Sequence, residues 1–187
     1  ELPRAIEKAR AERTKVAEIK HAGFGYDLFE TPRIEGKTHA LLPIMTGCDK
    51  VCSFCVVPFV RGREKSRSID EILSDVRRLS TGGTREVTFL GQNINTYGKG
   101  TGENLSELIE RTHAIPEIER IRYVTSHPRD MGADLIEQFG TLPKLCPALH
   151  LPFQSGSDQV LKRMSRLYTR ELYLQKIEAL KKARDAW

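Results

Sequence analysis

From about Thr38 onward, hydrophobic and polar positions follow two alternating periods. Residues 68–83 place apolar side chains at helical spacing, and Ser68 and Glu71 form a capping-box pattern at their start. Residues 85–91 are β-branched and apolar, which is typical of a buried strand. The same periodicities predict strands at 39–45, 120–126 and 148–154, and helices at 104–116, 133–140, 157–164 and 170–186.

This alternation of strands and helices predicts parallel strands joined by right-handed crossovers. We therefore expect an α/β fold, a partial TIM-like (β/α) barrel of about four βα units. No Gly-x-Gly-x-x-Gly follows the first predicted strand, which argues against a dinucleotide-binding fold.

The first 37 residues have a different pattern. Residues 1–20 are charged and weakly amphipathic, as in a surface helix, and residues 21–37 contain glycines and a proline without a period. We expect a helical segment and linker over 1–37, followed by a core over 38–187. Both ends of the chain lie inside helical patterns, so we interpret it as a fragment of a longer protein.

Polar sequence follows each predicted strand. The first strand is followed by a cysteine-rich loop, residues 47–56, and the others by "GQNINTYG", "SHPRD" and "QSGSD". In a parallel barrel the chemistry lies at the C-terminal ends of the strands, because those ends share one face. We therefore expect these four segments to form one site.

The cysteine loop, residues 47–56, carries three of the four cysteines, Cys48, Cys52 and Cys55. Four cysteines are too few for a disulfide framework, so the cluster indicates metal or redox chemistry. Zinc would need a fourth ligand, and Cys146 precedes the fourth predicted strand, at the opposite end of the barrel. A cubane iron–sulfur cluster on three thiolates keeps one iron open. Both a catalytic cluster and a zinc-stabilised nucleic-acid-binding module are compatible with these residues.

The spacing Cys-x-x-x-Cys-x-x-Cys, with Phe54 before the last cysteine, resembles radical S-adenosylmethionine (SAM) enzymes. Over residues 38–187, the segments "GCDKVCSFCVVPFVRGREKSR", "EVTFLGQNINTYG", "SHPRD" and "HLPFQSGSDQVLKRMSRLYTRELY" resemble the methylthiotransferases of this group. The segment "LGQNINTYG" is most similar to members that act on isopentenyl-modified adenosine in tRNA. Relatives that modify threonylcarbamoyladenosine in tRNA or a ribosomal protein differ there and remain alternatives.

The resemblance implies a fold, a reaction and two cofactors. The fold is the radical SAM barrel, and the three cysteines hold a [4Fe–4S] cluster whose open iron binds SAM. Reductive cleavage of SAM gives a 5′-deoxyadenosyl radical, and a methylthio group replaces the C2 hydrogen of N6-isopentenyladenosine next to the anticodon. Residues 1–37 correspond to the tail of an N-terminal domain that carries a second cluster in this family.

The resemblance also assigns residues to the site. Phe54 is expected beside the SAM adenine, Gly91 at a close backbone approach, and Gln92 or Asn93 in hydrogen bonds to SAM. No catalytic residue is assigned beyond the cluster, and His127 is left without a role. The expected cofactor-binding residues are Phe54, Gly91, Gln92, Asn93, Ser126, Gln154 and Ser155.

Composition and charge bear on the partners. A hydrophobic content of 39% suits a globular protein, and a net charge of +5 permits a polyanionic partner. Basic residues at alternating positions predict one face of an extended segment that binds tRNA phosphates, or alternatively a solvated basic loop or contacts within the barrel. Without an apolar run of roughly 20 residues, we expect a cytoplasmic monomer without a membrane. Its partners would be a tRNA anticodon stem-loop and an electron donor such as a flavodoxin or ferredoxin. The basic residues are Arg61, Arg63, Lys65 and Arg67.

Overall fold

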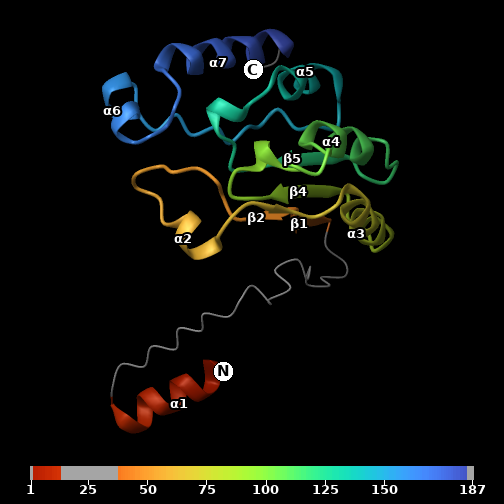
Figure 1. The fold of residues 1–187 in the computed structure, drawn as a ribbon. Coiled ribbons are helices and arrows are strands. Elements are labelled where there is room, and N and C mark those ends of the chain that lie inside the picture. Colours follow the sequence, from red (N-terminus) through yellow and green to blue (C-terminus); the bar gives the residue numbers. More distant parts are fainter. Residues whose placement is uncertain (1, 14–37, 185–187) are drawn as a thin grey trace.

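A computed structural model describes residues 2–13 and 38–184 (Figure 1). Helix α1 spans Leu2–Glu12, within the predicted N-terminal helical pattern. The linker predicted at 21–37 lies outside the described residues. No helix in the described part of the chain is long and apolar enough to cross a membrane.

The centre of the fold is a parallel sheet in the order β1–β4–β5. Strand β1 (His39–Pro43) pairs with β4 (Glu86–Leu90), which pairs with β5 (Arg120–Tyr123). The parallel α/β architecture is therefore confirmed. In the described residues the sheet stays open, as expected for part of a barrel.

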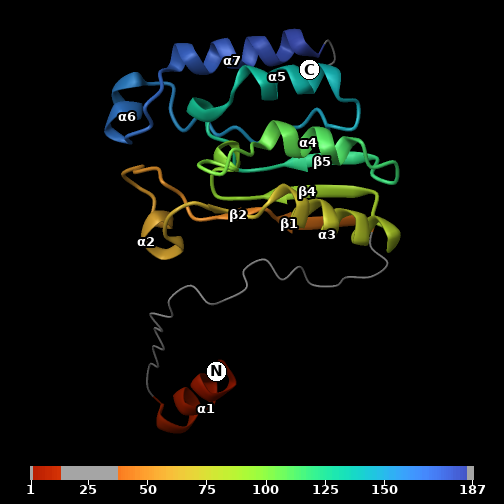
Figure 2. The same ribbon diagram turned by 45° about the vertical axis from the view of Figure 1, so that its right-hand side comes forward.

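Four helices form a layer along this sheet (Figures 1 and 2). Neighbours in the layer contact one another in the order α3, α4, α5 and α7. Each connects consecutive sheet segments or follows the last one, so the crossovers place them side by side. Their bounds are Ile69–Thr81 for α3, Leu105–His113 for α4, Ala133–Thr141 for α5 and Arg170–Ala183 for α7.

Helix α3 begins at a capping box formed by neighbouring residues in the sequence. The Ser68 hydroxyl accepts a hydrogen bond from the Glu71 N–H at 3.3 Å, and the Glu71 carboxylate accepts one from the Ser68 N–H at 3.2 Å. This confirms the capping box. The predicted apolar stripe of α3 is buried in the core with side chains from β4 and α4. The core includes Ile72, Leu73, Val76, Val87, Phe89, Leu108 and Ile109.

The predicted strand at 148–154 is wrong. An isolated parallel bridge, Leu145 to Ile121, lies before this segment. Within it, the His150 carbonyl accepts a backbone hydrogen bond from the Ser126 N–H, and no strand forms. Pro147 directly precedes the segment, and Pro152 lies within it. Since proline has no N–H, a continuous ladder cannot form across it.

The predicted first strand, 39–45, is divided into two parts. Strand β1 ends at Pro43, and β2 (Met45–Thr46) pairs antiparallel with β3 (Lys65–Ser66). This small second sheet closes the cysteine loop at its base.

Short elements occupy the C-terminal end of the sheet. Figure 2 shows α2 and α6 at the end toward which the arrow of β4 points. The segments that follow the strands therefore lie together at the C-terminal end of the sheet, as predicted. These elements are α2 (Val57–Arg61), the 3-10 turns η1 (Ile94–Thr96) and η2 (Pro128–Asp130), and α6 (Asp158–Arg163).

Candidate radical SAM site

A cavity of about 190 Å³ lies at the C-terminal end of the sheet. Cys48, Cys52 and Cys55 all line it. Segments that follow β4 and β5 line it as well, together with residues from the extended segment after Pro147. The predicted convergence of four chain segments on one site is therefore present in the structure. Five of the predicted cofactor residues line the cavity: Phe54, Gln92, Asn93, Ser126 and Gln154.

The cysteine loop is held in place from two sides. Gly47 has a φ of 81°, and a Cβ atom there would overlap the carbonyl oxygen of Arg63. Its N–H donates to the Gln92 side-chain oxygen at 2.6 Å, and the Cys48 N–H donates to the Gly62 carbonyl at 3.1 Å. The loop position is thus fixed by the β4 end and by the chain that returns toward β3.

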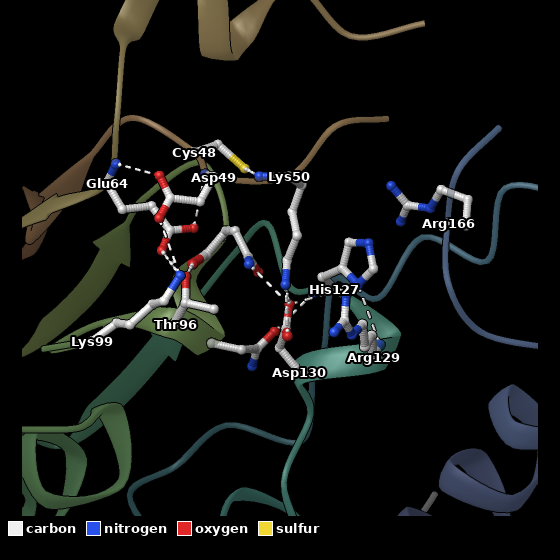
Figure 3. A network of polar contacts seen from close by, with 12 residues as sticks. Cys48, Asp49, Lys50, Glu64, Thr96, Lys99, His127, Arg129, Asp130 and Arg166 are labelled. Carbon is white, nitrogen blue, oxygen red and sulfur yellow. Dashed lines mark hydrogen bonds and ion pairs between the residues drawn. The ribbon is translucent and has the colours of Figure 1, made fainter. Parts of the chain in front are cut away.

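Asp49 and Glu64 add a second connection across the loop. The Asp49 N–H donates to the Glu64 carboxylate at 3.2 Å, and the Glu64 N–H donates to the Asp49 carboxylate at 3.3 Å. Lys99 also bonds Asp49, at 3.1 Å, and this contact holds the pKa of the Asp49 carboxyl below its usual range (Figure 3). These contacts between protein groups connect the start of the loop to Glu64 and Lys99.

Asn93 and Ser126 carry polar atoms without a partner in the described chain. Asn93 is 2% exposed, and its amide nitrogen donates to Asp130 at 2.9 Å, yet its side-chain oxygen accepts nothing. The buried Ser126 hydroxyl also has no hydrogen-bond partner. Buried polar groups are nearly always satisfied, so two orphaned ones lining a cavity fit a polar ligand there. A ligand with an ammonium or hydroxyl donor matches the Asn93 oxygen.

Two residues on the cavity wall have left-handed backbone conformations. Thr125 has a φ of 65° and Gln154 a φ of 64°. Non-glycine residues adopt this region at a cost and are concentrated at functional sites. The Thr125 hydroxyl hydrogen-bonds the Gly91 carbonyl, which holds the β4 and β5 ends together.

Gly91 and Ser155 are not among the cavity-lining residues. A Cβ atom on Gly91 would come within 2.6 Å of the Met45 side chain, so the glycine allows close packing of β4 against β2. The Ser155 hydroxyl accepts from the Ser157 N–H at 3.1 Å, beside the start of α6. The structure therefore gives both residues a supporting position, and their contact with a cofactor stays a prediction.

The four basic residues expected on one face do not share it. Arg61 ends helix α2, and only Lys65 and Ser66 of this stretch form a strand. The Arg67 side chain is turned inward to Asp75 at 2.6 Å. The Arg63 side chain is 86% exposed. The expectation of one extended face is wrong because α2 and a turn at Gly62 interrupt it.

Cys146 lies away from the cysteine loop. Its N–H bonds the Ile121 carbonyl, and its thiol lies near charged side chains of the first residues of β4 and β5, Glu86 and Arg120. This is the expected opposite end of the sheet. Within the described ranges, no three His, Cys, Asp or Glu side chains are grouped so that they could hold one metal ion.

Comparison with known proteins identifies the family. A profile of the Radical SAM superfamily matches residues 42–185. The chain belongs to this superfamily. The match includes the cysteine loop and the segments after β4 and β5.

Curated relatives of this radical SAM chain bear the name tRNA-2-methylthio-N(6)-dimethylallyladenosine synthase. The protein of Finegoldia magna is 51% identical over 143 residues, which cover 75% of this chain and 31% of that protein. The protein of Trichlorobacter lovleyi is 46% identical over 188 residues, 98% of this chain and 42% of that protein. The predicted resemblance to tRNA methylthiotransferases is confirmed. The chain spans less than half the length of these relatives.

Solved structures share the fold at low sequence identity. The radical SAM methyltransferase TsrM of Kitasatospora setae, with cobalamin and a [4Fe–4S] cluster bound, has a TM-score of 0.60 and 17% identity over 77% of this chain and 28% of its own. The cobalamin-dependent radical enzyme OxsB, with aqua-cobalamin and SAM bound, has a TM-score of 0.59 and 14% identity over 75% of this chain and 22% of its own. These similarities support the radical SAM fold alone.

The cavity is bordered by a charged network that was not among the predicted site residues (Figure 3). The Lys50 ammonium contacts both oxygens of Asp130, at 2.8 and 2.7 Å. Burial alone would raise the pKa of the Asp130 carboxyl, but hydrogen bonds from Lys50 and Asn93 hold it below its usual range. This pair joins the cysteine loop to η2. Lys50 lies between two cysteines in sequence, which was the available signal.

His127 is part of the same network as a neutral imidazole. Burial, together with the nearby Arg166, lowers the pKa of His127 to about 4. Its Nδ1 accepts from the Arg129 N–H at 3.2 Å, so the ring proton lies on Nε2. The ring also lines the cavity, where it offers a donor rather than a charge.

Arg166 also lines the cavity and was not among the residues predicted from the sequence. It comes from the segment after α6 and is 6% exposed, and its guanidinium donates to the Cys52 sulfur at 3.2 Å. In the sequence it belongs to "LKRMSR", a cluster of three basic residues in and after α6. Neither periodicity nor spacing distinguishes it from the exposed Lys162 and Arg163.

Proposed function

We propose that this chain is the catalytic core of a radical SAM tRNA methylthiotransferase that acts on N6-isopentenyladenosine beside the anticodon. The supporting observation is the combination of a three-cysteine cavity with relatives about half identical whose name states this activity. The inert C2–H bond of an adenine ring requires a radical route, since no side chain is basic enough to remove that hydrogen.

We assign the [4Fe–4S] cluster to Cys48, Cys52 and Cys55. When bound, the cluster and SAM supply the electron transfer and the radical. The chain contributes the surroundings. Asn93 and Ser126 offer unpaired polar atoms to the polar part of SAM, and Phe54 lies on the cavity wall for contact with its adenine.

We assign tRNA contact to the outer side of the cysteine loop and α2. This segment exposes five large apolar side chains, and Phe59 is 88% exposed. Exposed aromatic rings stack on unpaired bases, and arginines bind phosphates. Arg61 and Arg63 follow directly on the same segment. Four of these side chains, Val51, Val56, Phe59 and Val60, belong to the proposed tRNA surface, and the fifth, Phe54, lines the cavity.

The remaining parts of the proposal concern the longer protein. We infer that residues 1–37 continue an N-terminal domain with a second cluster, and that residues 38–187 are a core that lacks its last segments. A low-potential flavodoxin or ferredoxin would supply the electron. The 187-residue chain should therefore bind one cluster and SAM but not transfer sulfur.

The test uses a polypeptide of the relatives' full length that contains this chain. It is incubated without oxygen with SAM, a reductant and tRNA that carries isopentenyladenosine but no methylthio group. Nucleoside mass spectrometry should detect the methylthio product, and a Cys52→Ala variant should give none. Product only on threonylcarbamoyladenosine or on ribosomal protein would contradict the substrate assignment.

A further inference from the structure

A buried arginine contacts one of the three cavity cysteines. Arg166 is 6% exposed and lines the cavity, and one guanidinium nitrogen lies 3.2 Å from the Cys52 sulfur. Figure 3 shows its side chain pointing toward His127. Arginine keeps its charge under all physiological conditions, so this is a fixed positive charge beside a thiol.

The charge of Arg166 lacks a carboxylate partner among the described residues. Its Nε is buried without a hydrogen-bond partner, and no ion pair to Asp or Glu involves it in this part of the chain. Its guanidinium lies 5.5 Å from the Tyr168 ring centroid, a cation–π contact. A buried charge is costly unless an opposite charge compensates it. Among the described residues, the buried positive charge of Arg166 therefore has no carboxylate to compensate it.

The backbone holds Arg166 in this position. Ser165 and Leu167, on either side of it, have φ values of 55° and 57°, and the Arg166 N–H bonds the Leu161 carbonyl at 3.0 Å. The preceding Met164 carbonyl accepts from the Ser53 N–H at 3.1 Å, inside the cysteine loop. The left-handed Ser165 ends helix α6, with its N–H bonded to the Lys162 carbonyl, and the left-handed Leu167 turns the chain directly after the arginine. The backbone on both sides of Arg166 therefore sets the direction of its side chain.

We propose that Arg166 is the counter-charge of the [4Fe–4S] cluster and makes that cluster easier to reduce. This inference rests on the proposed function. A [4Fe–4S]²⁺ core on three thiolates carries a net charge of −1, and one electron from a low-potential carrier makes it −2. No bond changes in this step, and Arg166 keeps its proton. A nearby cation stabilises the more negative state, and hydrogen bonds to the cysteine sulfur raise the reduction potential.

The test compares three variants of the 187-residue chain. This chain has only Cys146 besides the three cavity cysteines, so it holds a single cluster. Arg166→Gln removes the charge, Arg166→Lys keeps it, and Arg163→Gln removes an exposed charge from the neighbouring helix α6. Each is reconstituted without oxygen, and the midpoint potential is measured without SAM by an EPR-monitored redox titration.

We expect Arg166→Gln to be harder to reduce. At the potential where half of the parent clusters are reduced, the ratio of reduced to oxidised cluster should fall about tenfold, which is a shift of about 59 mV for one electron. Arg166→Lys should lie nearer the parent, and Arg163→Gln should match it. If Arg166→Gln fails to retain iron, a cluster kept by Arg166→Lys still supports the charge role.

Three outcomes would overturn the inference. One is an Arg166→Gln cluster with the parent midpoint in the absence of SAM, even if SAM binding weakens. Another is an Arg166→Lys midpoint that falls as far as that of Arg166→Gln. The third is iron loss in both variants. A parent chain that takes up no iron would instead contradict the proposed function.

Discussion

The Gln92 side-chain oxygen accepts a hydrogen bond of 2.6 Å from the backbone N–H of Gly47. Gln92 lies two residues after the end of β4, and Gly47 opens the cysteine loop after β2. The residue expected to contact SAM thus uses its oxygen to position the loop that carries the cysteines. The side-chain NH₂ group is chemically able to donate to a ligand in the same cavity.

Replacement of Gln92 should therefore loosen the loop. Gln92→Leu leaves the Gly47 N–H without an acceptor, which costs about 1–3 kcal/mol in the free energy of unfolding. Gln92→Glu keeps an oxygen in place and should be close to the parent. Urea unfolding of the metal-free chain and iron content after reconstitution measure both effects. Equal stability and equal iron uptake in Gln92→Leu would show that the bond has no such role.

Gly47 itself should not tolerate a side chain. In Gly47→Ala the new Cβ overlaps the Arg63 carbonyl, so the loop must shift, and iron uptake should drop sharply. Gly100→Ala is the matched control, since Gly100 has a similar φ of 85° with nothing near its Cβ position. The control should lose only about 1–2 kcal/mol from backbone strain and keep its iron. Similar iron content in the two variants would contradict this assignment.

The buried His127 should make the metal-free chain sensitive to acid. Its pKa of about 4 in the fold lies below the unfolded value of about 6.5, so the unfolded state binds more protons between these values. Its contribution is present above about pH 6.5 and is lost as the pH falls toward 4, by up to about 3 kcal/mol. His127→Gln cannot titrate, so its stability should fall less over this range. Parallel stability–pH curves for parent and variant would refute this.

Arg63 and Arg67 should behave differently although they are two residues apart. Arg63→Gln removes an exposed charge and should weaken binding of an anticodon stem-loop, with a salt slope smaller by about 1. Arg67→Gln removes the more buried of the two arginines that pair with Asp75, while Arg78 stays in place, so it should cost about 1.5–3 kcal/mol of stability. Fluorescence anisotropy at several salt concentrations and urea unfolding distinguish the two. An unchanged salt slope in Arg63→Gln would remove Arg63 from the RNA-binding surface.

The sequence was sufficient for the parallel sheet and the helix layer because local signals agree with the fold. The capping box of Ser68 and Glu71, and the β-branched run of β4, are read from neighbouring residues. The prediction of a fourth strand at 148–154 was wrong because it rested on an apolar run, although one proline directly precedes that run and another lies within it. Pro147 and Pro152 indicate that a continuous ladder cannot form there, and the spacing of apolar residues does not record this.

The candidate site was predictable only in part, for a similar reason. The spacing of Cys48, Cys52 and Cys55 is a local pattern, so it indicated the site directly. Arg166 and Asp130 depend on long-range contacts, 114 residues away to Cys52 and 80 residues away to Lys50. The inward turn of Arg67 depends on Asp75 in the following helix. Composition gives no sign of which basic residue is buried.

The central claim is that three thiolates at one end of this sheet hold a cluster with an iron that is open to SAM. EPR spectroscopy of the reduced, anaerobically reconstituted 187-residue chain, with and without SAM, tests it directly. We predict about four irons per chain and a cluster signal that changes when SAM is added. Alanine at Cys48, Cys52 or Cys55 should abolish the signal, and Cys146→Ala should preserve it. A colourless chain with one zinc, or a signal that SAM leaves unchanged, would contradict the claim.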